Sequence, residues 1–496
     1  MATITFVYPD FESLGIEYLM AICRREGHQV GFEFYLAEDA YLGKKSGSIP
    51  FNAIAQRIVA GRPDMVGFSC VTDNYQYQLA CARAVKALAP DVVVLFGGIH
   101  PTAEPRRVLE EPAVDAIAIG EADRSLPVLL ERCGATGQFC LPAEPLQGIV
   151  FKKDGELIGA FDEGPLVELD QLPFPHKEPF LAQLKDAAHE YRTMTSRGCP
   201  YSCSYCFNSH FHKLRGRKII RQRTVDSVLA ELAWARARYP VKYIMFVDDS
   251  FTTNKKWVQE FCGRYRQEIG LPFACVANPH YITEEVAAEL SRAGCINVQI
   301  GIQSLSEELC AGVLNRKSSN AVVARAITAF KKNGVMVQVD HMLGIPGDSI
   351  EIQERSVAFY NTCRPNLISI FWLTYYPQTK ITDIAREQGL LSDADMDSIA
   401  AGIGLTGASY LTGGSMKDPR AFFCVSLLLN YLPILPRPLV TLLLKTRLYR
   451  LLGIKSFFIS TALPRVIQSL FNRRDFRGRS HMLRFIGKLF GAKSET

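Results

Sequence analysis

The stretch 196–207 reads SRGCPYSCSYCF and places three cysteines within eight positions, in the spacing C-x3-C-x2-C. Thiolates at Cys199, Cys203 and Cys206, on a loop bent by a glycine and a proline, can hold three corners of one iron–sulfur cube. A cube held by four cysteines carries electrons, whereas a cube held by three leaves one iron open to coordinate a small molecule. The spacing therefore allows a [4Fe–4S] cluster through which these cysteines would take part in catalysis.

A zinc site is the alternative for the same three cysteines. His210 and His212 follow shortly after the motif, and either imidazole would complete a tetrahedral Cys3His set. Spacing alone leaves both metals open. The motifs further along the chain, described below, favour the cluster.

Length and composition point to a multidomain protein of a reducing compartment. The 496 residues, 48% of them apolar, predict roughly two to four domains with sizeable cores. Residues 1–8 read MATITFVY, a strand rather than a basic leader, so we expect a cytoplasmic protein. Of 14 cysteines, those outside the motif are scattered singly, which is typical of free thiols in the core.

Residues 1–135 alternate short β-rich runs with helical patterns. Five strands joined by crossover helices predict a doubly wound parallel sheet of the Rossmann-like type. Ligands of such sheets bind at the carboxyl ends of the strands. The expected strands span residues 4–8, 29–35, 64–69, 92–96 and 116–119, and the expected helices span 14–26, 52–60, 75–88 and 105–109.

Small and polar residues at these strand ends are the candidate ligand contacts. They are Asp10, Ser69, Val71, Thr72, Gly97, Gly98, His100, Pro101, Gly120 and Glu121. The ensemble resembles the cobalamin-binding domain that precedes many radical S-adenosylmethionine (SAM) enzymes. The resemblance implies that the glycines at 97 and 98 admit the nucleotide tail of cobalamin. It also implies that His100 hydrogen-bonds near this tail rather than to cobalt. The alternative is a degenerate flavodoxin-like domain that only packs.

One residue departs from the related cobalamin proteins of the methionine synthase type. Glu12 stands where those proteins carry the histidine that binds cobalt. A carboxylate is a poor match for that nitrogen ligand. We therefore expect cobalamin to bind without a lower histidine ligand.

Residues 186–400 resume the alternation of strands and helices. Six units predict a partial (β/α)6 barrel, with reactive groups at the carboxyl ends of its strands. The expected strands span residues 190–195, 243–247, 273–277, 298–302, 335–343 and 367–373. The cysteine loop follows the first of them, and the motifs DDSF at 248–251, GIQS at 301–304 and GIPG at 344–347 follow later ones.

Together with the cysteines, these motifs resemble the radical SAM superfamily. The resemblance implies that the open iron chelates SAM and that an electron from the cluster cleaves it to a 5′-deoxyadenosyl radical. Gln303 stands where relatives carry a glutamate, which keeps a hydrogen-bonding group and removes a charge. The SAM contacts implied in this way are Tyr205, Asp248, Asp249, Gly301, Gln303, Ser304, Gly344 and Pro346.

Residues 1–400 as a whole resemble the cobalamin-dependent radical SAM enzymes, which include the anaerobic magnesium-porphyrin ester cyclase and radical SAM C-methyltransferases. The resemblance implies cluster, SAM and cobalamin as cofactors, with flavodoxin or ferredoxin as electron donor. The implied reaction is methyl transfer to an unactivated carbon of a small molecule. Cyclisation or rearrangement without methyl transfer is the alternative, and a cobalamin-binding sensor with a structural cluster is a more remote one.

The expected domains are a cobalamin-binding domain at 1–140, a linker with a hairpin at 141–185, the barrel at 186–400 and a helical basic region at 401–496. Residues 437–496 hold 13 Lys/Arg against 2 Asp/Glu, interleaved with leucines. Such amphipathic helices either lie in a membrane interface or form a lid over the barrel mouth. The first possibility favours a lipid, isoprenoid or tetrapyrrole substrate. Nucleic acid is not expected, because stacking aromatic residues are few there.

Overall fold

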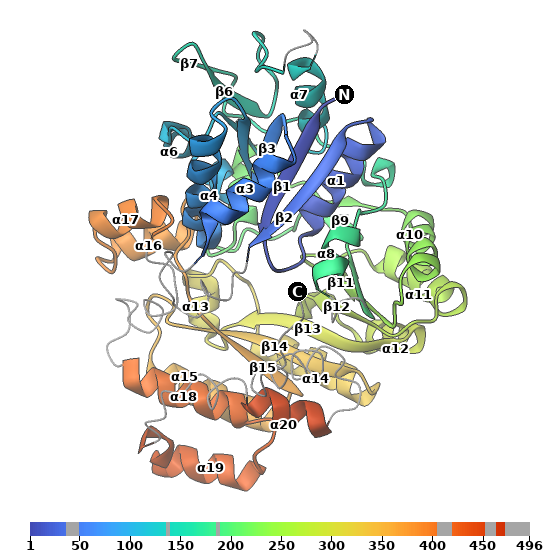
Figure 1. Ribbon diagram of the computed structural model, residues 1–496. Helices are drawn as coiled ribbons and strands as arrows, with labels where there is room; N and C mark the ends of the chain where they lie inside the picture. The colour runs from blue at the N-terminus through green and yellow to red at the C-terminus, as the bar shows by residue number, and fades with distance from the viewer. Residues whose placement is uncertain (36–48, 135–138, 185–188, 404–418, 452–462, 472–496) are drawn as a thin grey trace. The chain divides into compact units, whose positions relative to one another are not determined.

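The computed structural model describes residues 1–35, 49–134, 139–184, 189–403, 419–451 and 463–471 (Figure 1). The chain forms two compact units. Unit 1 comprises Met1–Leu184, Ser204–Ile219 and Thr374–Tyr410, and unit 2 comprises Lys185–Cys203, Ile220–Leu373 and Leu411–Thr496. The chain therefore passes from unit 2 to unit 1 within the cysteine motif.

Unit 1 is built on a seven-stranded sheet in the order β2-β1-β3-β4-β5-β6-β7. The first five strands are parallel, which confirms the predicted doubly wound sheet. They are β1 (Thr3–Pro9), β2 (Gln29–Tyr35), β3 (Met65–Ser69), β4 (Val93–Gly97) and β5 (Ala116–Ala118). The hairpin β6 (Ile149–Lys153) and β7 (Glu156–Ile158) continues this sheet in antiparallel fashion.

Helices cover both faces of this sheet because the side chains of each strand alternate between two cores. On β4, Val94 and Phe96 belong to one apolar cluster, whereas Val93 and Leu95 belong to the other. The crossover helices are α1 (Leu14–Arg25), α3 (Phe51–Ala60), α4 (Tyr75–Leu88), α5 (Ile99–Ala103), α6 (Pro105–Glu110) and α7 (Ser125–Cys133). Unit 1 also holds α8 (Glu178–Gln183), α9 (Asn208–Leu214), α16 (Lys380–Glu387) and α17 (Asp393–Ala400).

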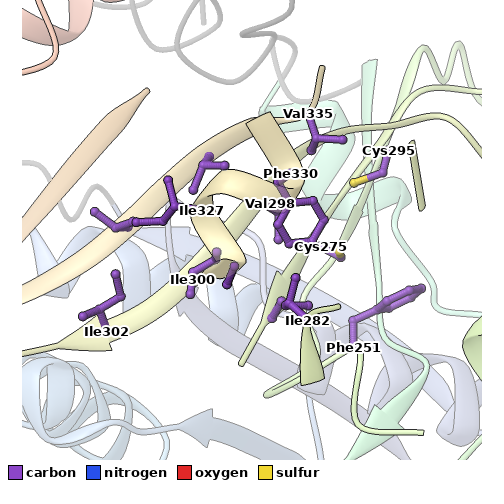
Figure 2. Close-up of a cluster of buried hydrophobic side chains, with 14 of the residues drawn as sticks. Phe251, Cys275, Ile282, Cys295, Val298, Ile300, Ile302, Ile327, Phe330 and Val335 are labelled. Carbon is purple, nitrogen blue, oxygen red and sulfur yellow. The ribbon is translucent and has the colours of Figure 1, made fainter. Parts of the chain in front are cut away.

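Unit 2 is built on six parallel strands in the order β15-β14-β13-β12-β11-β8, as expected for a partial barrel. They are β8 (Glu190–Thr193), β11 (Tyr243–Phe246), β12 (Phe273–Ala277), β13 (Cys295–Gln303), β14 (Met336–Leu343) and β15 (Leu367–Trp372). Side chains from strands and helices, among them Ile300 and Phe330, fill its apolar core (Figure 2). A short strand, β9 (Ser196–Arg197), precedes the cysteine loop and pairs antiparallel with β10 (Arg221–Gln222), which follows the loop.

Local sequence sets the starts of the helices in unit 2. Each of six helices begins after a Ser, Thr or Asn whose side chain accepts a backbone N–H of the first turn. These caps are Thr224, Asn254, Thr283, Ser306, Ser319 and Ser349. They precede α10 (Val225–Arg238), α11 (Lys255–Glu268), α12 (Glu284–Ala293), α13 (Glu307–Gly312), α14 (Asn320–Lys332) and α15 (Ile350–Cys363).

The C-terminal region is in part a piece of the unit 2 core. Helix α18 (Pro419–Tyr431) packs against α15 and β15, and its Val425 and Leu429 are fully buried. Helix α19 (Arg437–Thr446) instead leaves leucines exposed. Helix α20 (Leu463–Phe471) follows, whereas residues 404–418, 452–462 and 472–496 of the predicted helical basic region lie outside the described residues. Among the described residues, no helix is long and apolar enough to cross a bilayer.

Candidate functional site

The cysteine loop leaves the end of β9 through Gly198, whose backbone has a φ of +98° that favours glycine. Cys203 is buried, whereas Cys199 and Cys206 are partly exposed. Tyr205 and Cys206 lie in the part of the loop that belongs to unit 1, where Asn208 Nδ2 donates to Cys206 Sγ at 3.7 Å. No disulfide bond joins any of the 14 cysteines, all of which lie in the described part of the chain.

Asp248 anchors the start of this loop. Its carboxylate is buried and accepts bonds from Thr195 Oγ1 at 2.7 Å, from Thr195 N at 3.0 Å and from Ser196 Oγ at 2.6 Å. Burial raises the pKa of Asp248, and the bonds from Ser196 and Thr195 oppose this shift. The sequence pattern predicts Asp248 as a SAM contact, but the structure directs its carboxylate to the backbone that leads into Cys199. Its neighbour Asp249 is exposed.

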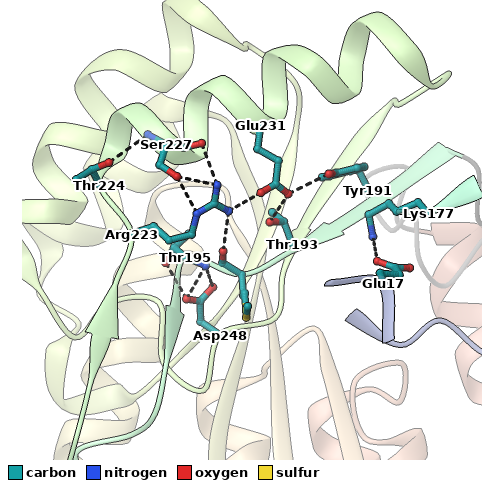
Figure 3. A network of polar contacts seen from close by, with 11 residues as sticks. Glu17, Lys177, Tyr191, Thr193, Thr195, Arg223, Thr224, Ser227, Glu231 and Asp248 are labelled. Carbon is teal, nitrogen blue, oxygen red and sulfur yellow. Dashed lines mark hydrogen bonds and ion pairs between the residues drawn. The ribbon is translucent and has the colours of Figure 1, made fainter. Parts of the chain in front are cut away.

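A buried ion pair of Arg223 and Glu231 is bonded to side chains of β8, the strand that precedes β9 and the cysteine loop (Figure 3). Arg223 and Glu231 are 4% and 1% exposed, and the guanidinium also donates to the Met194 carbonyl at 3.3 Å. Tyr191 Oη and Thr193 Oγ1 donate to Glu231 at 2.9 Å and 2.8 Å. The strand that delivers the cysteine loop is thereby held by several charge-assisted hydrogen bonds, which are stronger than neutral ones. Sequence reasoning missed this network.

At the end of β13, the structure brings the predicted residue Gly301 to the cysteine loop through Arg316. The guanidinium of Arg316 donates to the Gly301 carbonyl and to Cys203 Sγ. Gln303 occupies the left-handed region with a φ of +71°, at a register shift between β13 and β14. The hydroxyl of Ser304 accepts from the backbone N–H of Ser306 at 3.1 Å.

A network of hydrogen-bonded side chains holds the GIPG loop that follows β14. Asp348 accepts from Gly344 N at 3.1 Å and from Gln353 Nε2 at 2.9 Å. Gln353 Oε1 lies 2.7 Å from His341 Nε2, and His341 Nδ1 lies 3.1 Å from Tyr360 Oη. Burial raises the pKa of Asp348 to about 6 and lowers the pKa of His341 to about 4. Pro346 lies buried within the loop.

Gly98, at the carboxyl edge of the unit 1 sheet, is required by the packing of the protein's own backbone. Its φ is +99°, and a Cβ there would lie 2.7 Å from the Cys70 carbonyl oxygen. A Cβ at Gly97 would make only ordinary contact, at 3.6 Å from Ala118 Cβ. The sequence argument gives both glycines the same role, but the structure separates them. Only Gly98 is required for the approach of two backbones.

His100 and Thr102 tie this edge together. The His100 ring is buried, its Nδ1 lies 3.2 Å from Thr72 Oγ1, and its Nε2 has no hydrogen-bond partner. Burial lowers the pKa of His100 to about 4, so the ring is neutral at pH 7. Thr102 Oγ1 donates to the Gly98 carbonyl at 2.7 Å and accepts from Gly120 N at 2.9 Å. Sequence reasoning did not single out Thr102.

Other predicted residues of this edge have partners within unit 1. Glu163 lies against Gly120, and Arg215 bridges Glu163 at 2.6 Å and Glu121 at 3.2 Å. Val71 N donates to Asn74 Oδ1 at 3.0 Å. Ser69 ends β3, Asp10 directly follows β1, and Pro101 is buried in α5.

Glu12 is held by a lysine from the segment 141–185, the expected linker. Lys177 Nζ lies 2.6 Å from Glu12 Oε1 and 2.6 Å from Glu17 Oε2, and its side chain is 1% exposed. Figure 3 shows the bond to Glu17. The Glu12 side chain is itself 5% exposed. The residue that stands at the cobalt-ligand position of related proteins is thus fixed by an ion pair inside the fold.

Two donor sets fit the cofactors expected from the sequence. The three cysteines lie on one loop, and Cys203 already accepts a cationic hydrogen bond, as a cluster thiolate can. At the unit 1 edge, small residues and the unpartnered Nε2 of His100 offer polar groups at a strand end. Among the described residues, no three His, Cys, Asp or Glu side chains are placed to hold a single metal ion.

Comparison with known proteins identifies both units. The model of the radical SAM superfamily matches residues 193–359, and the model of the B12 binding domain matches residues 2–130. The chain therefore carries a B12 binding domain followed by a radical SAM domain. It is a cobalamin-dependent radical SAM enzyme, whose cofactors are a [4Fe–4S] cluster, SAM and cobalamin.

Two relatives of this chain carry the names of two different activities, a methyltransferase and a cyclase. An uncharacterized methyltransferase of Pyrococcus horikoshii is 28% identical over 76% of this chain and 79% of the relative. The anaerobic magnesium-protoporphyrin IX monomethyl ester cyclase of Rubrivivax gelatinosus is 22% identical over 78% of this chain and 70% of the relative. The solved structure of the cobalamin-dependent SAM radical enzyme OxsB has a TM-score of 0.66 at 15% identity, covering 95% of this chain and 75% of OxsB. The OxsB likeness confirms the architecture.

Proposed function

We propose that this enzyme methylates an unactivated carbon of a hydrophobic small molecule, with Cys199, Cys203 and Cys206 as the cluster ligands. When bound, the cluster and SAM supply a carbon-centred radical and cobalamin supplies the methyl group. The observation that carries the proposal is the C-x3-C-x2-C loop, anchored by a buried Asp248, in one chain with the glycine edge of the B12 binding domain. Reduced flavodoxin or ferredoxin is the proposed electron donor.

The residues around the cysteine loop have distinct proposed tasks. Asp248 fixes the backbone before the first cysteine, so we assign it to the loop rather than to SAM. We propose that the GIPG loop receives the adenine of SAM, because Asp348 and Gln353 hold it from below. The remaining proposed SAM contacts are Tyr205, Asp249, Gly301, Gln303, Ser304, Gly344 and Pro346.

The unit 1 edge has the proposed task of holding cobalamin without a cobalt ligand from the protein. Lys177 holds Glu12 in an ion pair, which supports the absence of a lower nitrogen ligand. Gly97 leaves space at the strand end, and the neutral His100 has one nitrogen available for a hydrogen bond. The other proposed contacts are Asp10, Ser69, Val71, Thr72, Gly98, Pro101, Gly120 and Glu121.

Methyl transfer is tested by the fate of the methyl group. Purified protein is reconstituted with iron, sulfide and cobalamin, reduced, and incubated anaerobically with cell lipids and SAM labelled in the methyl group. The expected result is label in a lipid-soluble product that is absent with Cys203→Ala. The cyclase relative supports a second candidate, ring closure or rearrangement. 5′-Deoxyadenosine formed with an unlabelled product would favour this candidate.

We further propose that α19 docks on an anionic membrane surface, from which a lipid-like substrate would be taken. Exposed leucines alternate with cationic side chains on α19 and on residues 447–451, which follow it. The leucines are Leu439, Leu442, Leu448 and Leu451, and the cations are Arg437, Lys445 and Arg447. Each cation near an anionic bilayer contributes about 1 kcal/mol. By contrast, the leucines of α18 are already buried, so they support the packing alternative.

Point variants test this docking, because truncation before α18 would expose the core. Leu442→Glu is expected to reduce sedimentation with vesicles of anionic phospholipid at low salt, while leaving far-UV circular dichroism unchanged. Leu88→Glu is the matched control, since Leu88 is an exposed leucine at the end of α4 in unit 1. Equal sedimentation of both variants and the wild type would exclude α19 as the docking surface.

A further inference from the structure

Two consecutive residues after α13 hold two consecutive residues of the cysteine loop within unit 2. Asn315, with a left-handed φ of +49°, donates through Nδ2 to the Ser202 carbonyl at 2.8 Å. Arg316 Nη1 donates to Cys203 Sγ at 3.7 Å. The other terminal nitrogen of the guanidinium donates to the Gly301 carbonyl at the end of β13. The guanidinium is therefore fixed at both ends of its fork.

This contact is shielded from water. Arg316 is 9% exposed and Cys203 is 5% exposed. A buried charge acts at a lower effective dielectric than a surface charge and is screened less by salt. The guanidinium also keeps its charge at every working pH. The sulfur of Cys203 thus faces a permanent, immobile cation.

A cationic hydrogen bond to a ligating sulfur changes the redox balance of a cluster. The reduced cluster carries one more negative charge than the oxidised cluster, so a nearby cation stabilises the reduced state more. Hydrogen bonds to the sulfurs and local charge are among the features that set the reduction potential of iron–sulfur clusters.

We infer that Arg316 is a positioning residue that holds the Cys203 sulfur and raises the reduction potential of the cluster. The inference rests on the proposed function, because it takes Cys203 as a cluster ligand. It assigns to Arg316 a role in electron uptake by the cluster before SAM is bound. An arginine that acts on SAM alone would leave the SAM-free cluster unchanged.

The test is an anaerobic reductive titration of the SAM-free [4Fe–4S] protein, followed by electron paramagnetic resonance. Arg316→Gln removes the charge and the fork, and Arg316→Lys keeps the charge without the fork. Arg292→Gln is the control, since Arg292 is an exposed arginine near the end of α12. We expect Arg316→Gln to lower the ratio of reduced to oxidised cluster about tenfold at a fixed potential, which is 59 mV for one electron. Arg316→Lys should lower the midpoint by a smaller but measurable amount, because an ammonium does not reproduce the two bonds of the fork, and Arg292→Gln should leave the midpoint unchanged.

The outcomes separate this inference from the proposed function. An Arg316→Gln protein with full iron content and the wild-type midpoint would overturn the inference and leave the proposed function intact. A wild-type protein that assembles no cluster would instead defeat the proposed function. If Arg316→Gln alone fails to assemble the cluster, the Arg316→Lys midpoint decides, because an unshifted value there would also overturn the inference.

Discussion

Lys177→Met removes the ammonium that pairs with two buried carboxylates of unit 1, Glu12 and Glu17, and is expected to destabilise this unit strongly. Glu17 is fully buried and Glu12 is 5% exposed, so neither carboxylate can recover its hydration. Breaking a buried ion pair by removing one partner costs about 3–5 kcal/mol. Because a protein's whole stability is about 5–15 kcal/mol, this is a large fraction.

The loss should depend on pH in a defined direction. Burial raises the pKa of Glu17 from 4.5 to about 8, with Lys177 opposing the shift. Folded Glu17 therefore binds more protons than unfolded Glu17 between these values, and stability falls as pH rises through this window. Without the ammonium, the fall should be steeper. We expect Lys177→Met to be closest to wild type near pH 5 and furthest from it near pH 9.

Hydrogen exchange of peptides from α1 is the assay, because it reports opening of unit 1 alone. The double variant Lys177→Met with Glu17→Gln should recover a large part of the loss, since it removes one stranded charge. Glu17→Gln by itself serves as the matched control and should cost less than Lys177→Met, because the bond from Lys177 to Glu12 remains. Exchange in Lys177→Met that equals the wild type at pH 9 would refute the reasoning.

Three further perturbations probe the two cofactor edges. Gly97→Val should abolish cobalamin binding without loss of fold, as measured by absorbance after gel filtration. Gly15→Ala, at an open position, should bind cobalamin normally. Full binding by Gly97→Val would show that the cobalamin site lies elsewhere. Asp248→Ala leaves the Thr195 and Ser196 donors without their acceptor, so it should lower the free energy of unfolding by about 1–3 kcal/mol. It should also lower the iron content after reconstitution. An iron content equal to that of the wild type would show that Asp248 does not anchor the loop. Asp348→Asn should flatten the pH dependence of unit 2 stability between pH 4 and 6. Because the folded pKa of Asp348 is raised to about 6, its ionisation lowers the stability of the wild type as pH rises through this range. An unchanged slope of stability against pH, measured by chemical denaturation, would contradict this.

The sequence predicted the strands of both sheets closely because each is a short apolar run bounded by turn residues. Residues 29–35 and 273–277 match β2 and β12 at both ends. By contrast, β13 begins at Cys295, three residues before the predicted start at Val298, because pairing with β12 from Cys295 and with β14 from Asn297 extends the strand beyond its β-branched run. Helix α7 was missed, since its nine residues contain an early proline and a short apolar face.

The candidate site was predictable only where its residues are neighbours in sequence. The cysteine spacing and the GIPG run are local patterns, so the sequence displays them directly. Lys177 meets Glu12 across 165 positions and Arg316 meets Cys203 across 113, and no spacing rule links such residues. The same limit explains Asp248, whose partners Thr195 and Ser196 lie 53 and 52 positions away.

These distant contacts have a shared physical character. Asp248, Glu231 and Lys177 are each almost fully buried, and each one is bonded to the backbone or side chains that carry a predicted cofactor segment. Burying a charge costs free energy that a well-packed apolar residue would not, so such pairs are weak sources of stability. Their geometry is nevertheless strict, because a charge-assisted bond is lost when the partner moves by an ångström or so. We therefore interpret them as restraints on position: the cysteine loop and the cobalamin edge are held in place at the expense of some stability, and substitutions at these charges should impair cofactor loading at least as much as global unfolding.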